Sequence, residues 1–581
     1  MRNRASGKHS ANISQPVYLE YGNVRRWQML TLRSTSCTGA RRKVPRRAGR
    51  FSSLAYPPLF AGALVLGVAA HSPGQYRLPD LLGVLAFVSL ATLLVGVAVL
   101  AGVRAFDRSG RAVPLAAALT GIAIAWCFYY VPLRSALSGA VHPLARSRIL
   151  VPLGGLGTLL AVSWLLGLPR ERLLAVSAFM ARFGVVLVAL LAAQIFTAHL
   201  RAPSAVKRSA LVDSLAQPVR TTGAPSPGRN TPPRDIYLIV LDGHANARVL
   251  GEVFKYDAAP FEDSLRTLGF LVPRDMRSNY VQTYLSLASL LNAAHVTRLT
   301  GDAGLTSTDH SLPTYLVKHN RVARFLKERG YKYVLFPSAW WAPTKDSPLA
   351  DEEFEAHTGS SFADVVGRTE LRRAVLESTL LHLVLKPERE PVPMVQQIIR
   401  SFEGLRDIPA DPAPTFAFAH ILVPHAPYLL DEHCHPLEHP IADDMQADTP
   451  EQRAIYVGQV RCVDRLVLNA VTALLRRSST LPVILVVSDH GSGFSYLDFY
   501  GHPESVPLAF IRERFGAFGA FYLPAGGDSV FSEPVTLVNV LGNVLRYYFN
   551  ADLPESPNDM HVSGQELFHF YPVDPLQYSA P

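Results

Sequence analysis

The sequence predicts an N-terminal α-helical membrane domain with five spans, followed by an outer α/β domain whose mostly parallel sheet is sandwiched between helices. Two patterns predict this fold class. Five apolar stretches follow a basic tail, and each has roughly the 20 residues that a helix needs to cross a bilayer. Later in the chain, short unbroken apolar runs alternate with helix-like stretches, as parallel strands do when helices cover both faces of their sheet.

The positive charge of the chain is concentrated in residues 1–50. This tail holds twelve Lys and Arg and the single acid Glu20, a net charge of +11, whereas the whole chain of 581 residues carries +9, so the remainder carries −2. Basic residues beside a first membrane span orient a protein and attract anionic lipid. We therefore expect a cytoplasmic tail beside a membrane and no nucleic-acid partner.

The predicted spans give the topology. They lie near residues 54–72, 81–103, 114–133, 149–168 and 175–197. Five such stretches exclude a cleavable signal peptide. None holds a central carboxylate or Lys, so they indicate an anchor rather than an ion-coupled transporter. The basic tail should stay inside, although Arg146 and Arg148 oppose this mildly, and an odd number of spans then places the rest of the chain outside.

Four segments are expected in a multi-pass protein of the cytoplasmic, or inner, membrane. They are a cytoplasmic tail (1–50), a five-helix membrane domain (51–199), a linker rich in Pro, Ser, Gly and Thr (200–234) and an extracytoplasmic catalytic domain (235–581). Cys434 and Cys462 fall in the last segment. In an oxidising compartment they either form a disulfide or remain unpaired.

Within the outer domain, the apolar patterns predict alternating strands and helices. The strands are expected at 236–241, 332–336, 415–423, 482–488 and 506–511. The helices are expected at 259–268, 283–293, 320–329, 366–385, 450–477 and 535–548.

Three of these predicted strands end in residues that can bind a metal. Asp242 and Gly243 follow the first strand, His425 follows the third between two prolines, and Asp489 and His490 follow the fourth. Ligands of open α/β sheets gather beyond the carboxyl ends of the strands, and carboxylate and imidazole groups suit Zn²⁺ or Mn²⁺. Each residue alone also fits a plain structural role, such as an Asp-Gly turn, so the prediction depends on their convergence.

A threonine, a later histidine and a tryptophan complete the candidate site. Thr283 begins a helix-like stretch, where the helix dipole and unpaired N–H groups favour phosphate, sulfate or an ionised alkoxide, although an N-cap is the plain alternative. His502 either folds back over the site or lies on the surface. Trp341, beside Trp340, either packs on a lipid headgroup or sugar or fills an apolar gap. Asp464 is expected to be structural.

Four segments in this order, IYLIVLDG, SNYVQTYLSLASLLN, HILVPHAPY and VVSDHG, resemble the alkaline phosphatase superfamily. The resemblance is to its sulfatase-like branch, which includes membrane-anchored phosphoethanolamine and phosphoglycerol transferases and lipoteichoic acid synthases. It covers about residues 235–515 and implies an alkaline phosphatase-like fold.

The resemblance also implies the roles of the site residues. Asp242, Thr283, Asp489 and His490 would bind one divalent metal, Zn or Mn, with Mg or Ca as alternatives. Thr283 would be the nucleophile. His425 and His502 would bind the charged group of the substrate.

Two departures from true sulfatases narrow the expected chemistry. The sequence lacks the C/S-x-P-x-R motif whose Cys or Ser becomes formylglycine, and Thr283 stands at the nucleophile position. Asp242 is a single acid rather than one of a pair, which indicates one metal, while a second metal at His420 or His244 is left open.

We therefore expect a metal-dependent transferase that moves a phospho-headgroup from a membrane lipid to an envelope glycan or lipid. Two alternatives stay open. One is a metal-dependent phosphate or sulfate ester hydrolase, which uses water as the acceptor. The other is a non-catalytic membrane assembly protein.

Overall fold

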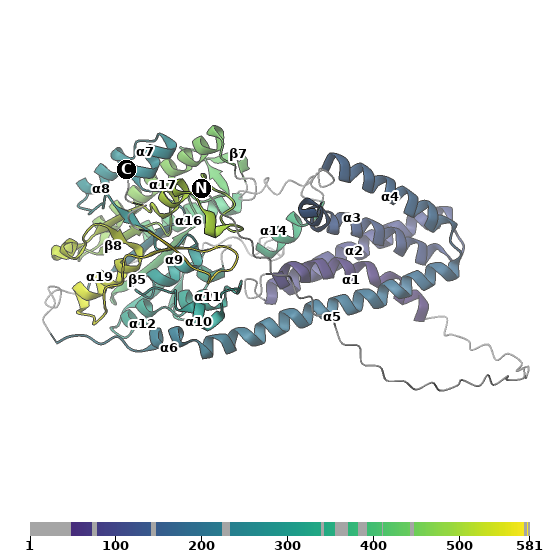
Figure 1. Cartoon of the computed structure of the whole chain (residues 1–581), viewed down its shortest axis with the longest axis horizontal. Coiled ribbons are helices and arrows are strands. Elements are labelled where there is room, and N and C mark those ends of the chain that lie inside the picture. The colour runs from purple at the N-terminus through teal and green to yellow at the C-terminus, as the bar shows by residue number, and fades with distance from the viewer. Residues whose placement is uncertain are drawn as a thin grey trace, which may run out of the picture. The chain divides into compact units, whose positions relative to one another are not determined.

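The computed structural model describes residues 48–71, 78–140, 147–223, 233–338, 342–354, 370–380, 392–408, 411–441, 447–574 and 578. Apolar helices come first along the chain, and an α/β domain follows them (Figure 1).

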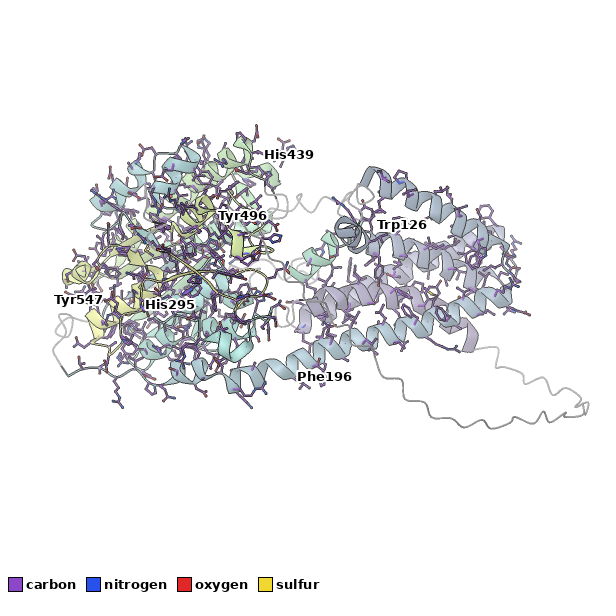
Figure 2. The ribbon with its side chains drawn as sticks, viewed as in Figure 1. Trp126, Phe196, His295, His439, Tyr496 and Tyr547 are labelled. Atoms are coloured by element: carbon purple, nitrogen blue, oxygen red, sulfur yellow. A yellow bond between two sulfur atoms is a disulfide. The ribbon has the colours of Figure 1, made fainter. Side chains whose placement is uncertain are left out.

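The N-terminal part consists of five apolar helices, as the sequence predicts. They are α1 (Ala48–His71), α2 (Leu78–Phe106), α3 (Ala112–Ala140), α4 (Ser147–Gly167) and α5 (Arg170–Arg208). The last four are long and apolar enough to cross a membrane, whereas the apolar part of α1 described by the structure, Tyr56–Ala70, is shorter. Large apolar side chains such as Trp164 on α4 and Phe196 on α5 are exposed, and such a surface suits lipid rather than water. Figure 2 labels Phe196.

A six-stranded sheet forms the centre of the α/β domain. Its strand order is β4-β3-β5-β1-β8-β9, and every neighbouring pair is parallel except β8 and β9. The strands are β1 (Ile236–Leu241), β3 (Lys332–Phe336), β4 (Glu352–Glu353), β5 (Thr415–Ile421), β8 (Val483–Val487) and β9 (Gly519–Tyr522). The predicted mostly parallel sheet is confirmed.

Helices cover both faces of this sheet because alternate side chains of its buried strands point in opposite directions. Leu238 and Val240 of β1 belong to one core, and Ile239 and Leu241 to the other. The first core contains residues of α6 (Ala210–Ala216), α9 (Thr283–Leu290), α11 (Ser311–Lys318), α12 (Arg321–Lys327) and α19 (Leu537–Phe549). The second contains residues of α8 (Ala259–Thr267), α16 (Val392–Asp407) and α17 (Pro450–Arg477).

Shorter elements complete the described domain. They are α7 (Ala247–Phe254), α10 (Leu299–Ala303), α14 (Glu370–Glu377), α18 (Leu508–Phe515), β2 (Met276–Arg277), β6 (Tyr428–Leu430), β7 (Pro436–Ile441), β10 (Val535–Thr536), β11 (Met560–Val562), β12 (Tyr571–Val573), and the 3₁₀ turns η1 (Ala342–Thr344), η4 (Pro503–Ser505) and η5 (Pro524–Val530).

One predicted strand is wrong. Residues 506–511 were expected to be extended, but helix α18 begins at Leu508 after Pro507. A short apolar run does not distinguish a buried strand from a buried helix turn, and proline suits a helix start. The edge of the sheet is instead formed by β9, which contains Gly519 and pairs antiparallel with β8.

The expectation of a linker is wrong for residues 200–216. Helix α5 continues to Arg208, and α6 follows after Ser209, whose Oγ accepts a hydrogen bond from Val212 N at 3.1 Å. Leu211 and Leu215 of α6 are buried in the first core, since their helical spacing places them on one face. Residues 224–232 of the expected linker lie outside the described residues.

Cys434 and Cys462 form a disulfide, one of the two alternatives left open by the sequence. Cys462 is buried in the middle of α17, and Cys434 lies in the turn between β6 and β7. The bond therefore ties α17 to the segment that follows β5.

Candidate active site

The carboxyl ends of three adjacent strands, β5, β1 and β8, bring the candidate ligands together. Asp242 directly follows β1, and its backbone N–H donates to Ile421 O of β5 at 3.0 Å. Gly243 then turns the chain with a φ of +72°, a conformation that glycine adopts without strain. Asp489 and His490 lie just beyond β8. Parallel strands thus place their C-terminal residues at one edge, as the sequence predicts.

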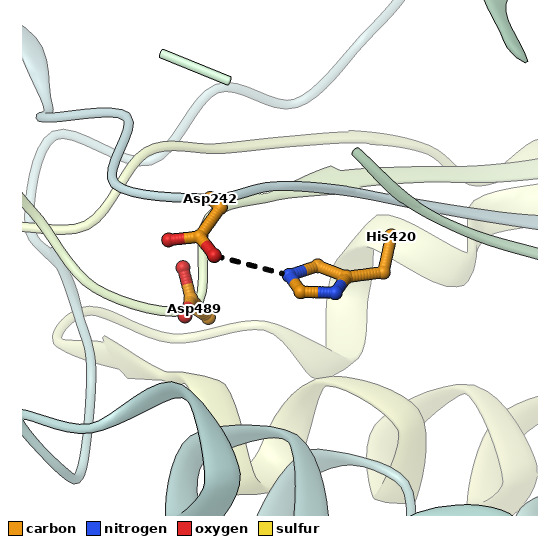
Figure 3. Close-up of side chains that lie close together, drawn as sticks. All are labelled: Asp242, His420 and Asp489. Carbon is orange, nitrogen blue, oxygen red and sulfur yellow. Dashed lines mark ion pairs between the residues drawn. The ribbon is translucent and has the colours of Figure 1, made fainter. Parts of the chain in front are cut away.

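Two aspartates and a histidine form a buried group that fits a metal ion. One ligand atom each from Asp242, His420 and Asp489 lies within 4.8 Å of the others. Asp242 Oδ2 is 3.4 Å from His420 Nε2, and the two carboxylates face each other (Figure 3). Asp242 Oδ1 and Asp489 Oδ2 are buried and accept no hydrogen bond from the described residues. Because unsatisfied buried carboxylate oxygens are costly, these atoms suit coordination to a divalent cation.

His490 presents a nitrogen lone pair to the same carboxylates. Its Nε2 lies 3.2 Å from Asp489 Oδ2 and 3.6 Å from Asp242 Oδ1. Its Nδ1 lies 2.9 Å from Gly491 O, to which it donates, so the ring proton is on Nδ1. This backbone contact fixes the ring in the tautomer that a metal-binding histidine needs.

Thr283 lies at the start of α9, and its Oγ1 is 3.1 Å from His490 Nε2. The preceding Gln282 does not cap the helix, because its side chain donates to Ser563 O and Gly564 O instead. The half-buried hydroxyl of Thr283 therefore sits at a helix end without a side-chain cap, beside the group of ligands.

Burial and neighbouring charges shift the pKa values of Asp242, Asp489 and His490. Burial, and next the neighbouring Asp242 carboxylate, raise the pKa of Asp489 to about 6. Burial also disfavours the charge of Asp242, but the positive charge of His425 and a hydrogen bond from His420 lower its pKa below the ordinary value. Burial lowers the pKa of His490, which favours its neutral form. The site therefore combines a neutral imidazole with two carboxylates that repel each other. A bound cation would stabilise this combination of charges.

His425 lies next to this group. Its backbone N–H donates to Asp242 O at 2.9 Å, and its ring centroid is 6.0 Å from that of His490. Its Nδ1 is 2.6 Å from Ala426 O, which places the proton on Nδ1. The neighbouring Pro424 and Pro427 both follow cis peptide bonds.

Other predicted residues lie elsewhere. The side chain of His502 is 60% exposed, and its Nδ1 is 3.5 Å from Glu504 Oε1. Trp341 lies outside the described residues. His244 is buried with its Nε2 2.9 Å from Asp464 Oδ1, which gives Asp464 the structural role expected of it.

The sequence patterns missed one residue of the site and left another open. Arg514 of α18 donates from Nη2 to His490 Nε2 at 2.9 Å, yet no motif surrounds it. His420 was considered only for a second metal. It lies inside β5 rather than after it, so the rule of strand ends did not select it.

Comparisons with known proteins give similarities to solved structures only. No family model and no curated protein matches this chain. The periplasmic domain of EptC from Escherichia coli, also solved in complex with Zn, is 12% identical over 60% of this chain and 94% of that chain, with a TM-score of 0.36. The lipooligosaccharide phosphoethanolamine transferase EptA from Neisseria meningitidis is 14% identical over 88% of this chain and 96% of that chain, with a TM-score of 0.35.

A third similar structure is the phosphonate monoester hydrolase of Agrobacterium radiobacter. It is 13% identical over 57% of this chain and 80% of that chain, with a TM-score of 0.35. TM-scores this low assign no function to the chain.

Proposed function

We propose that this chain is a membrane-anchored, metal-dependent enzyme that transfers a phospho-headgroup from a membrane lipid to an envelope glycan or lipid, with Thr283 as nucleophile. The observation that supports this most is the pair of buried oxygens, Asp242 Oδ1 and Asp489 Oδ2, that accept no hydrogen bond within the described part of the chain. Both face His490 Nε2, which also contacts the Thr283 hydroxyl. A cation site and a candidate nucleophile therefore coincide.

The metal would be held by Asp242, Thr283, Asp489 and His490, with His420 as a further candidate ligand. A bound divalent cation, Zn or Mn or alternatively Mg or Ca, would lower the pKa of a coordinated hydroxyl and offset phosphoryl charge.

Thr283 Oγ1 attacks the phosphorus of the donor lipid. The new oxygen–phosphorus bond forms while the bond from phosphorus to the leaving oxygen of the lipid breaks, which leaves the headgroup phosphate on Thr283. His425 lies close enough to bind phosphoryl oxygens and to protonate the leaving oxygen. In the second half of the reaction, an acceptor hydroxyl attacks the phosphorus and passes its proton to His425, which the first half left neutral. The bond from phosphorus to Thr283 Oγ1 breaks and restores the Thr283 alkoxide.

The membrane helices would hold the enzyme at the bilayer surface, where its lipid donor is found. A lipid donor presents its headgroup at the bilayer surface, and the predicted orientation places the α/β domain on the extracytoplasmic side. An anchored enzyme therefore meets donor and acceptor at one surface. His502 and Trp341 stay predictions for binding the substrate.

Intact-mass spectrometry of the purified full chain tests the nucleophile. After incubation with Zn²⁺ and headgroup-labelled phosphatidylethanolamine or phosphatidylglycerol, the wild type should gain the mass of the phospho-headgroup on Thr283. Thr283→Ala should gain no mass and give no product. Ser289→Ala is the matched control, because the buried Ser289 hydroxyl of the same helix has no hydrogen-bond partner among the residues that the structure describes and should be dispensable. Turnover by Thr283→Ala would overturn the assignment.

Product analysis separates the classes of reaction. Label recovered on an envelope glycan or lipid supports transfer. Free labelled headgroup phosphate in the presence of acceptor indicates a hydrolase instead. A chain that binds metal but modifies neither donor indicates a binding or assembly role.

A further inference from the structure

The Arg514 side chain is buried against the candidate metal ligands. Its Nε donates to Val281 O at 2.9 Å, its Nη1 lies 3.4 Å from Gly491 O, and its Nη2 donates to His490 Nε2 at 2.9 Å. The guanidinium also lies over the Phe499 ring, 5.4 Å from its centroid. Two of its three polar contacts are thus with backbone carbonyls, and the third is with a candidate metal ligand.

The contact with His490 conflicts with metal binding. A guanidinium can only donate, so Nε2 must accept through its one lone pair. The same lone pair is the one that a metal would use. Once His490 binds a metal, the Nη2 donor of Arg514 has to find another acceptor. The contacts with Val281 O and Gly491 O would still hold the guanidinium at the site.

A phosphoryl group on Thr283 would supply that acceptor. Thr283 Oγ1 and Arg514 Nη2 both lie within hydrogen-bond distance of the same nitrogen, His490 Nε2, at 3.1 and 2.9 Å. Phosphate oxygens bound to Oγ1 would lie within reach of Nη2. Arginine binds such oxygens well because its planar donors match their geometry and its charge persists after burial.

We propose that Arg514 is a metal-gated phosphoryl-binding residue. In the metal-free protein it occupies the His490 lone pair, and in the metal-bound protein it donates to an anionic phosphoryl group at Thr283. This inference rests on the proposed function of the same site. It adds an order of events, since anion binding at Arg514 follows metal binding at His490.

Two binding measurements on the purified full chain test this role. In the background of Thr283→Ala, which removes chemistry, Zn²⁺ affinity is measured by competition with a chelator, and affinity for inorganic phosphate is measured by calorimetry after Zn²⁺ loading. Adding Arg514→Met should raise Zn²⁺ affinity several-fold, because a competing donor and a like charge are removed. The same substitution should lower phosphate affinity at least tenfold, because the bound phosphate loses its contact with the Arg514 guanidinium.

A merely structural role predicts a different result. If Arg514 only supports the fold, its removal should weaken Zn²⁺ and phosphate binding together, and that outcome overturns the proposal. Unchanged Zn²⁺ affinity overturns it as well, since His490 would then not be the shared partner. Arg514→Lys replaces Arg514→Met in these measurements if the latter fails to fold. It keeps the positive charge but loses the planar pair of donors, so it should retain Zn²⁺ binding and show intermediate phosphate affinity.

The matched control is Arg476→Met, which removes the same charge from an exposed residue in the last turn of α17. Both affinities should stay at the values of the Thr283→Ala parent. Because no measurement here depends on turnover, failure of the Arg514 proposal is distinguishable from failure of Thr283 as nucleophile, which the mass measurement reports.

Discussion

Gln459 holds the backbone on both sides of His425. Its Oε1 accepts hydrogen bonds from Leu429 N at 2.8 Å and Leu430 N at 3.0 Å, and its Nε2 donates to Pro424 O at 3.1 Å and His425 O at 3.3 Å. The side chain is fully buried within α17. One residue of this helix thus fixes the loop that carries a proposed substrate-binding histidine.

Gln459→Leu should therefore damage both stability and substrate binding. The substitution removes the hydrogen bonds that Gln459 makes to two N–H groups and two carbonyls, at a cost of about 2–4 kcal/mol in the free energy of unfolding. A looser His425 should raise KM for the donor lipid more than it lowers kcat. A wild-type KM in Gln459→Leu would contradict this role.

Gly491 should not tolerate a side chain. A Cβ on Gly491 would overlap Glu513 O and lie 2.7 Å from Gly516 O, and both are backbone atoms that cannot move aside cheaply. We expect Gly491→Ala to lower the free energy of unfolding by about 2–3 kcal/mol and to displace the adjacent His490. Metal content per chain, measured by elemental analysis, should fall with the melting temperature.

A neighbouring glycine provides the control for that prediction. A Cβ on Gly493 would lie 3.4 Å from Arg514 Nη1 and 3.7 Å from Phe510, which are ordinary contacts. Gly493→Ala should therefore keep its metal and its melting temperature. Equal behaviour of the two variants would show that the close approach of α18 to Gly491 is unimportant.

The sequence predicts the site where chemistry and position along the strand agree. Asp242, Asp489 and His490 directly follow apolar runs, so the geometry of a parallel sheet alone places them together. His420 and Arg514 could not be found in this way. His420 points to the site from within a strand, and Arg514 reaches it through the packing of α18, which depends on tertiary contacts that no local pattern encodes.

The disulfide should stabilise the outer domain. Cys434 and Cys462 are 28 residues apart, and closing a loop of that length in the unfolded chain is worth about 3–4 kcal/mol in a chain-entropy estimate. Replacing both cysteines with serine should therefore lower the melting temperature of the full chain. A reductant should lower the wild-type value similarly and leave the double variant unchanged. A reductant effect of the same size on the double variant would point to another cause.

His561 should make stability depend on pH. Its ring stacks on Tyr280, with centroids 5.7 Å apart, and lies 5.8 Å from the ring of His295 (Figure 2 labels His295). Burial, and next the charge of His295, lower the pKa of His561 from 6.5 to about 4, against a small opposing effect of Asp559. Between these values the unfolded chain binds a proton that the folded chain resists. The free energy of unfolding should therefore fall as pH drops from about 6.5 to about 4.

Thermal unfolding of the detergent-solubilised full chain across this pH range checks the prediction. Each pKa unit corresponds to about 1.4 kcal/mol, but His561 is only partly buried and solvent screens its charge, so we expect a loss of about 1–2 kcal/mol. His561→Gln removes this titration and should flatten the profile, whereas His433→Gln, at an exposed position, should not. All other titrating groups are common to the variants, so their contributions cancel in the comparison. Superimposable profiles for His561→Gln and the wild type would mean that His561 takes up its proton equally in the folded and unfolded chains.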